Sequence, residues 1–398
     1  MKAVFVYSNF DFSVKNAGVT RMRYYAQSLA NDNTAVYLMT CSSSAINSES
    51  LEEIFPNVFI LKNNIKTQSF SGTFKFIKNL FKFSKDAAEK SVFLFYPSPL
   101  VYLEIIAMYY IKWRKKCRVF YELNEIRKYT ATFQPKLSLS KPKYSIKKIV
   151  YKTVFSSLER LLKSYNGLIC ISTSIEEYGQ KFNTSTIRIP ILTNPDLKKT
   201  YSEKNYSVRN SFNIGFSGSI HPTKENLNDF FYVLTELNTL NLNFTLNLCG
   251  PIKKEHEDQL LDKKAEALGI KNRINYYGNL NEIELSTFLS QQELLVITRG
   301  YTLQNKYGFS TKLSDYLDHS KPILVTDISD NKLFIKDGVN GFIVPPNDNE
   351  SMLNKLKYII DNYDAIKDEV CKNANDTSRN SFYYQLYGND LRTFLFES

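Results

Sequence analysis

Short runs of apolar residues alternate with amphipathic segments along most of the chain. In the first half, these runs predict strands at residues 2–7, 35–40, 58–61, 92–96, 119–123 and 167–172. In the second half they predict strands at 212–217, 244–249, 274–277, 293–298, 323–325 and 342–344. Each run is bounded by polar or turn residues, which is typical of strands buried in a parallel sheet.

Apolar residues at helical spacing occupy the intervals between these strands. They predict helices at 22–30, 227–237, 257–268 and 282–290, and another that begins near Ser310 or Thr311. A regular succession of strand, loop and helix is the pattern of α/β proteins with parallel sheets. The sequence therefore predicts an α/β fold.

The same succession starts a second time after residues 187–206, a stretch rich in Pro, Asn and Lys without periodicity. A chain of 398 residues is also too long for one ordinary core. We therefore expect two doubly wound, Rossmann-like domains that face a central cleft, at 1–195 and 207–380. The aromatic, amphipathic stretch near the end is expected to form a helix that packs back on the first domain, which adds 381–398 to that domain.

Composition narrows the class of protein. The five cysteines are scattered and the chain has only three histidines, so neither a disulfide framework nor a zinc or histidine-built metal site is expected. The first residues do not resemble a signal peptide, and the longest apolar stretch, 99–113, is too short to span a bilayer. These features predict a cytoplasmic protein.

The net charge of +11 is concentrated in two Lys-rich segments, 74–90 and 136–163, which interleave Lys with apolar and aromatic residues. This pattern suits peripheral attachment to an anionic membrane surface, such as the inner face of the plasma membrane. A nucleic-acid surface is an alternative, although no recognition motif accompanies the basic residues, and a solvated helix face is another. We expect no nucleic-acid partner.

The segment around residue 310 carries candidate binding chemistry. A glycine-containing approach, Tyr307 to Ser310, leads into a predicted helix that carries Lys312 and Asp315. Backbone N–H groups and a lysine at a helix start favour phosphate, and a carboxylate can accept hydrogen bonds from ribose hydroxyls. The same residues also fit an ordinary solvated helix, so both interpretations stay open at this point.

Two carboxylates, Glu122 and Glu125, lie at the carboxyl end of the strand predicted at 119–123. Ligands of open α/β sheets bind at the carboxyl ends of the strands, although Glu125 would equally suit the start of the next helix. The first loop contains Gly18 but no G-x-G-x-x-G pattern, which argues against a dinucleotide cofactor.

Three segments of the second half resemble family 4 glycosyltransferases, which have the GT-B fold of two Rossmann-like domains. NIGFSGSIHPTKENL is similar to the family's G-R-L…K-G phosphate loop, and INYYGNLNEIELSTFLSQQELLVITR to the segment that follows it. YGFSTKLSDYLDHSKPILVTD…DGVNGFIVPPND resembles the family's segment with two Glu separated by seven residues. Together these matches cover about residues 212 to 360, and the first half matches more loosely.

The resemblance implies a donor-binding set. Asp315 matches the second Glu of the motif, which binds the ribose hydroxyls, and Lys224 matches the lysine that neutralises the diphosphate. Gly308 and Phe309 match positions whose backbone amides meet the sugar, and Gly18 matches the first-domain loop that approaches the diphosphate. The complete expected set is Gly18, Gly218, Ser219, Lys224, Arg299, Tyr307, Gly308, Phe309, Ser310, Thr311, Lys312 and Asp315.

The chain departs from the family pattern at three positions. Tyr307 stands in place of the first Glu, Ser219 in place of the loop arginine, and Asp315 is one methylene shorter than Glu. Arg299, which follows a predicted strand, is the candidate replacement for the missing arginine.

The resemblance implies a retaining transferase that moves a sugar from a nucleotide sugar, UDP- or GDP-linked, to a saccharide or lipid-linked acceptor in surface polysaccharide assembly. No metal and no cofactor are expected, because Lys224, Lys312 and a helix start would stabilise the leaving diphosphate and no Asp-x-Asp pair occurs. The expected catalytic residues are Lys224, Glu122 and Glu125. A non-catalytic sugar-nucleotide-binding scaffold and a nucleotide-sugar isomerase on the same fold are the alternatives.

Overall fold

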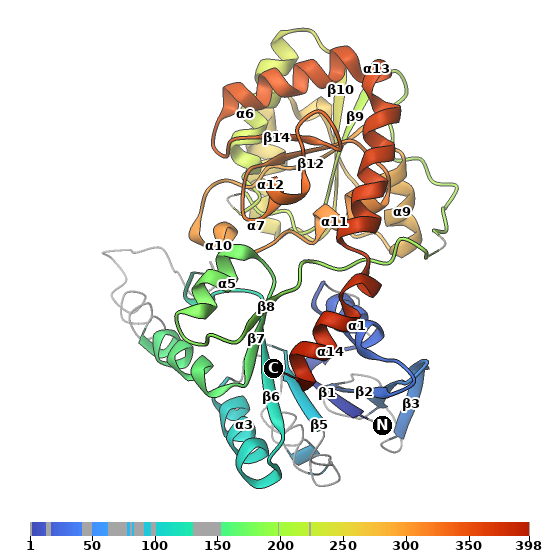
Figure 1. Cartoon of the computed structure of the whole chain (residues 1–398). Coiled ribbons are helices and arrows are strands. Elements are labelled where there is room, and N and C mark those ends of the chain that lie inside the picture. The colour runs from blue at the N-terminus through green and yellow to red at the C-terminus, as the bar shows by residue number, and fades with distance from the viewer. Residues whose placement is uncertain are drawn as a thin grey trace. The chain divides into compact units, whose positions relative to one another are not determined.

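The computed structural model describes residues 2–12, 17–41, 50–62, 78–79, 82, 91–96, 101–129, 153–197, 199–222 and 224–397. The predicted membrane-binding segments, 74–90 and 136–163, therefore lie outside the described residues except for 78–79, 82 and 153–163. The chain forms two compact units. One unit comprises Met1–Leu192, Tyr307–Phe309 and Tyr384–Ser398, and the other comprises Thr193–Lys306 and Ser310–Tyr383 (Figure 1).

The first unit is built on a mixed sheet of eight strands in the order β3-β4-β2-β1-β5-β6-β7-β8. All neighbouring strands are parallel except β3 and β4, which are antiparallel. The strands are β1 (Lys2–Asp11), β2 (Thr34–Cys41), β3 (Ser50–Phe55), β4 (Val58–Lys62), β5 (Ser91–Phe95), β6 (Arg118–Leu123), β7 (Gly167–Cys170) and β8 (Thr186–Arg188). Its helices include α1 (Ala17–Leu29), α3 (Val101–Lys115), η1 (Arg127–Tyr129), η3 (Leu161–Ser164), α5 (Thr173–Gln180), η6 (Tyr384–Tyr387) and α14 (Gly388–Phe396).

The second unit has a parallel sheet of six strands in the order β11-β10-β9-β12-β13-β14. These are β9 (Phe212–Ser217), β10 (Phe244–Cys249), β11 (Ile274–Tyr276), β12 (Leu294–Ile297), β13 (Ile323–Thr326) and β14 (Phe342–Val344). Its helices are α6 (Leu227–Thr239), α7 (Lys254–Glu257), the π-helical η4 (Asp258–Lys264), α8 (Ala265–Ala267), η5 (Lys271–Arg273), α9 (Glu282–Ser290), α10 (Leu303–Lys306), α11 (Lys312–Asp318), α12 (Asn331–Phe334) and α13 (Asn349–Ser381).

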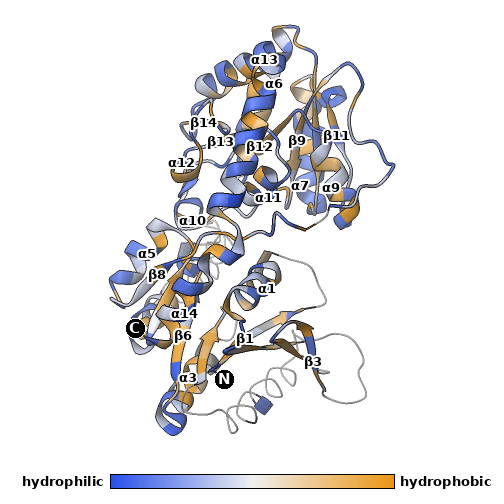
Figure 2. Ribbon diagram, turned by 45° about the vertical axis from the view of Figure 1, so that its right-hand side comes forward, coloured by the Kyte–Doolittle hydropathy of each residue, from blue (hydrophilic) through white to orange (hydrophobic). Residues whose placement is uncertain are grey.

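Each sheet is buried by helices, as expected from strands that are apolar along their whole length. Strands β2, β5, β10 and β12 are buried almost throughout, and Figure 2 shows β1 and β6 coloured as hydrophobic. In the last part of the chain, Arg392 of α14 donates a 2.7 Å hydrogen bond to the Ser28 carbonyl oxygen at the end of α1. The terminal helix thus packs within the first unit, next to α1.

The predicted fold class is confirmed: both units are doubly wound α/β folds. Strand boundaries at 212–217, 244–249 and 342–344 and the helix at 282–290 agree with the predicted ones. The antiparallel edge strand β3 was not predicted, because its sequence SLEEIF is largely exposed and lacks an apolar run. No described helix combines the length and apolar character needed to cross a bilayer.

Candidate functional site

The strand order of the second sheet locates a site before any side chain is considered. Its direction of winding reverses between β9 and β12, and ligands of open α/β sheets bind at the carboxyl ends of such a pair. The loop after β9 contains Gly218, Ser219 and Lys224, and Arg299 follows β12. Four residues of the expected donor set therefore lie at the point that the topology selects.

Two glycines shape the floor of this site. Gly218 has a φ of 121°, which L side chains rarely adopt, and a Cβ there would lie 2.6 Å from Cε of Lys312. A Cβ on Gly250, at the end of β10, would lie 2.3 Å from the carbonyl oxygen of Gly218. The glycines thus allow the Lys312 side chain to lie directly on the backbone of the β9 loop.

A buried ion cluster occupies the centre of the site. The carboxylate of Glu225 lies 3.1 Å from Nζ of Lys312 and 3.2 Å from Nη2 of Arg299. Glu225 is 2% exposed, and the two cationic side chains are 11% and 12% exposed. The cluster has one negative and two positive charges, so it carries a net positive charge in the interior of the domain.

Backbone contacts hold this cluster to the sheet. Thr298 at the end of β12 donates a 2.6 Å hydrogen bond to the Glu225 carbonyl oxygen. Asn305, on α10, donates 2.9 Å hydrogen bonds to the carbonyl oxygens of Lys224 and Gly300. The backbone N–H of Lys224 donates a 3.1 Å hydrogen bond to Nδ1 of His221. The backbone of Lys224 and Glu225 is therefore held by hydrogen bonds on both sides of their shared peptide bond.

The electrostatics of the cluster suit an anion, and one of its cations, Lys312, titrates close to neutral pH. Burial lowers the pKa of Lys312 to about 8, opposed by Glu225 and reinforced by the positive charges of Arg299 and Lys224. Burial alone would raise the pKa of Glu225, but Lys312 and Arg299 more than reverse this and hold the pKa well below its usual range. A bound diphosphate would supply the negative charge that these cations lack.

The remaining second-unit residues of the expected set surround α11. Leu313, Tyr316 and Leu317 of α11 are buried, whereas Asp315 is exposed. Thr311 occupies the position before the helix without a side-chain capping hydrogen bond, and the buried Ser310 hydroxyl has no hydrogen-bond partner among the described atoms. Ser219 is exposed, and its neutral side chain offers no positive charge to a phosphate.

Tyr307, Gly308, Phe309 and Gly18 belong to the first unit. The Tyr307 ring stacks on Tyr129 with the centroids 5.4 Å apart, and meets Tyr178 edge-on at 5.4 Å. The helix after the first strand begins at Ala17 rather than at the predicted Met22, so Gly18 lies in its first turn and not in a preceding loop. The predicted start was wrong because the early turn lacks a strong apolar periodicity.

Glu122 is placed in the interior of the first unit. It is fully buried and accepts hydrogen bonds from Arg21 Nε at 2.7 Å and from the Tyr25 hydroxyl at 2.8 Å. Arg21 also donates to the carbonyl oxygens of Ile189 and Pro190. Burial raises the pKa of the Glu122 carboxyl, although Arg21 opposes the shift. These contacts join α1, β6 and the chain after β8, so they indicate a structural role for Glu122.

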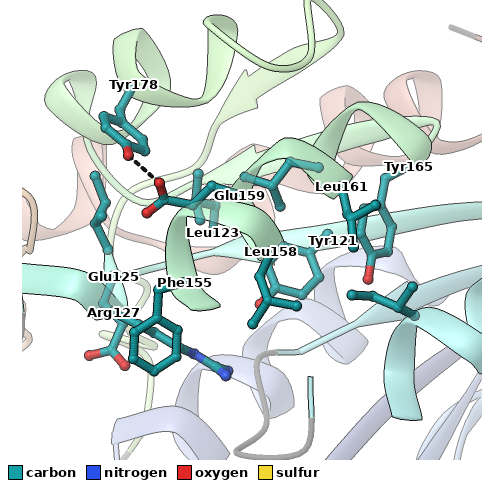
Figure 3. A pocket seen from close by; sticks show the side chains of 13 residues that line it. Tyr121, Leu123, Glu125, Arg127, Phe155, Leu158, Glu159, Leu161, Tyr165 and Tyr178 are labelled. Atoms are coloured by element: carbon teal, nitrogen blue, oxygen red, sulfur yellow. Dashed lines mark hydrogen bonds between the residues drawn. The ribbon is translucent and has the colours of Figure 1, made fainter. Parts of the chain in front are cut away.

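Glu125 is exposed and lines a cavity that is partly open to solvent (Figure 3). The walls are mostly apolar and aromatic, and they include Tyr121, Leu158 and Tyr165. Glu159, which also lines the cavity, accepts hydrogen bonds from Tyr178 at 2.6 Å (Figure 3) and from Lys128 at 2.8 Å. Of the two predicted carboxylates, Glu125 is the one that a ligand can reach.

Sequence reasoning missed Glu225. It follows Lys224 directly, and an acid beside a lysine in a polar loop gives no signal of burial. Only its contacts with Arg299 and Lys312, which are far away in the sequence, define its role.

The chain was compared with protein families, with curated proteins and with solved structures. Residues 198–380 match the family model described as glycosyl transferases group 1. A comparison with curated proteins gave no match. The fold resembles sucrose-phosphate synthase from Thermosynechococcus elongatus over 98% of this chain and 97% of the other, with 12% identity and a TM-score of 0.74.

Two further solved structures extend over the whole chain. HepE of Anabaena, solved in complex with UDP, matches with a TM-score of 0.66 and 15% identity over 98% of each chain. WaaG, a glycosyltransferase involved in lipopolysaccharide biosynthesis, matches with a TM-score of 0.61 and 14% identity over 100% of each chain. The chain therefore has the GT-B fold of two Rossmann-like domains, and residues 198–380 of its second half match the glycosyl transferases group 1 model.

Proposed function

We propose that the protein transfers a sugar from a nucleotide-sugar donor to a saccharide or lipid-linked saccharide, with retention of configuration, in surface polysaccharide assembly. The observation that carries this proposal is the net-positive cluster of Glu225, Arg299 and Lys312 at the switch point of the second sheet. The group 1 glycosyltransferase match covers the same region, and HepE, which shares the fold, was solved with UDP.

The chemistry would be departure of a nucleoside diphosphate from the sugar. Negative charge develops on the leaving diphosphate, and cations that are already in place stabilise it without reorganisation. Lys224, Arg299 and Lys312 are the side chains proposed for this task, with Arg299 in the role of the arginine that Ser219 replaces. On this proposal neither a metal ion nor a cofactor is required.

The exposed carboxylate of Asp315 is proposed to accept hydrogen bonds from the ribose hydroxyls. It lies one helical turn from Lys312, so one short helix would contact both the ribose and the diphosphate. In the first unit, Glu125 is proposed to orient the acceptor hydroxyl, since it is exposed at the cavity shown in Figure 3.

A thermal-shift panel of UDP- and GDP-sugars tests the proposal. We expect one nucleotide class to raise the melting temperature of the wild type, because a ligand that binds only the native state stabilises it by mass action. Asp315→Ala is expected to abolish most of that shift while leaving the melting temperature of the free protein unchanged, since Asp315 is exposed. If no nucleotide sugar gives a shift, the donor-site assignment is wrong.

Product analysis with the nucleotide sugar that gives a shift, with and without an acceptor, separates the alternatives. A scaffold subunit, suggested by Tyr307 and Ser219 in the places of Glu and Arg, would bind the donor but show no turnover with any acceptor. An isomerase would release an altered nucleotide sugar when no acceptor is present.

Donor affinity is expected to depend on pH through Lys312. Its pKa of about 8 means that the free amine replaces the ammonium as the pH rises above 8, and the diphosphate then loses one cationic partner. Affinity for the nucleotide sugar should therefore be constant near pH 7 and fall severalfold by about pH 9. Lys312→Arg, which stays charged, should remove this dependence in a calorimetric titration; an unchanged pH profile would show that Lys312 does not contact the diphosphate.

A further inference from the structure

Helix α3 exposes a stripe of large apolar side chains. Ile106 is 60% exposed, Tyr109 47% and Trp113 88%. Trp113 is the single tryptophan of the chain. Large apolar side chains that gather on one exposed face mark a surface that contacts something apolar.

The exposed apolar residues of α3 lie on a different face of the helix from its buried apolar residues. Residues 106, 109 and 113 are spaced so that their side chains project from one side of an α-helix. Ala107, Met108 and Ile111 are buried on the opposite side. Helix α3 therefore has two apolar faces, one that packs into the first unit and one that does not.

Basic side chains border this stripe. Lys112, Arg114, Lys115 and Lys116 accompany it, and no acidic residue occurs between Ile105 and Arg118. Arg114 and Lys116 are exposed. The chain after Lys116, which has a φ of 52°, turns away into β6.

The positive surface continues onto the neighbouring η3. Lys112 donates a 2.6 Å hydrogen bond to the carbonyl oxygen of Ser164, and the Tyr109 hydroxyl lies 2.7 Å from Ser164 Oγ. Lys163, next to Ser164, is exposed. Glu159, which lines the same cavity as Ile105, is paired with Lys128.

We propose that this face of α3 docks on an anionic lipid bilayer, with Ile106, Tyr109 and Trp113 in the headgroup region and the surrounding Lys and Arg against the lipid phosphates. Tryptophan and tyrosine favour the interface because their rings are apolar and each has one polar group. Basic side chains beside an apolar face are the pattern of helices that lie in the plane of a membrane surface. A second copy of the chain is a poorer occupant, since a two-fold contact would oppose like charges.

The docking face deepens the proposal of a lipid-linked acceptor, and its biological purpose rests on that proposal. The binding itself does not require the transfer reaction. Vesicle binding can therefore fail while donor binding succeeds, and the reverse, so the two proposals are tested separately.

The experiment uses the fluorescence of Trp113, which no other tryptophan obscures. The full chain is mixed with phosphatidylcholine vesicles that contain about one third phosphatidylglycerol, or none, at low and at high salt. We expect the emission to shift to shorter wavelength and to become protected from iodide with the anionic vesicles only, and co-sedimentation to decline with salt. An emission that does not respond to anionic vesicles overturns the proposal.

Variants locate the effect. Trp113→Ala should weaken co-sedimentation about tenfold, and Arg114→Glu combined with Lys116→Glu should weaken it by more than tenfold, since each basic residue near an anionic surface contributes about fivefold. Tyr232→Ala, which removes a half-exposed aromatic ring from α6, is the matched control and should bind like the wild type. All variants should keep the wild-type melting temperature.

Two results would contradict the proposal directly. Unchanged co-sedimentation of both α3 variants would place the membrane contact elsewhere. A blue shift that appears with rising protein concentration in the absence of lipid would show that a second copy covers the face.

Discussion

Replacing Lys224 by alanine is expected to lower kcat/KM for the donor by about 100- to 1000-fold, the effect of removing one preorganised charge partner from a developing anion. Lys224 lies in the loop after β9, and its backbone is held by Asn305 and His221 through main-chain groups that the substitution keeps. The loss should fall mainly on kcat, because the diphosphate carries more charge as it leaves than in the bound donor. Initial rates over a range of donor concentrations measure this.

Two comparisons make the Lys224 result specific. Lys332→Ala, which removes a lysine that is 76% exposed elsewhere in the same unit, should leave kcat/KM unchanged. Lys224→Ala should also retain the wild-type melting temperature. A variant with nearly normal kcat would assign stabilisation of the leaving group to Arg299 and Lys312 alone, and the match of Lys224 to the family lysine would then lose its functional meaning.

The sheets were predictable because parallel strands buried on both faces are continuous apolar runs with polar ends. That signal defined 212–217 and 244–249 correctly from sequence alone. It fails where a strand is exposed: β3 has four consecutive exposed residues at its start, and its pairing with β4 depends on backbone hydrogen bonds that leave no pattern in the side chains.

Part of the candidate site was predictable because some of its residues belong to local sequence patterns. Lys224 and Lys312 belong to local motifs, and Arg299 follows a predicted strand, so position along the chain was enough to select them. Glu225 and Glu122 required the fold. Both are acids whose partners are remote in sequence, and whether such a carboxylate is solvated, catalytic or buried in an ion pair depends on what the topology brings next to it.

Replacing Glu225 by glutamine is expected to destabilise the second unit strongly and to strengthen donor binding. The amide keeps the shape of the side chain but leaves Arg299 and Lys312 buried close together without a counter-charge, and breaking a buried ion pair in this way costs about 3–5 kcal/mol. A nucleotide sugar would restore negative charge at the same place. Its stabilising effect in a thermal-shift titration should therefore be larger for Glu225→Gln than for the wild type.

The effect of Glu225→Gln on the melting temperature should depend on pH, whereas the effect of a simple packing defect should not. The folded-state pKa of Glu225 is held below its usual value, so its contribution to stability is fully present above about pH 4.5 and declines as the pH falls further. The difference in melting temperature between the wild type and Glu225→Gln should be constant near neutrality and narrow in acid.

Asp361→Asn, which removes an exposed carboxylate paired with Lys357, should leave the melting temperature almost unchanged at every pH. A wild-type melting temperature for Glu225→Gln would mean that the carboxylate does not hold the two cations. A difference that persists undiminished in acid would instead point to packing, and Arg299 and Lys312 would then need another explanation for lying together at the switch point of the sheet.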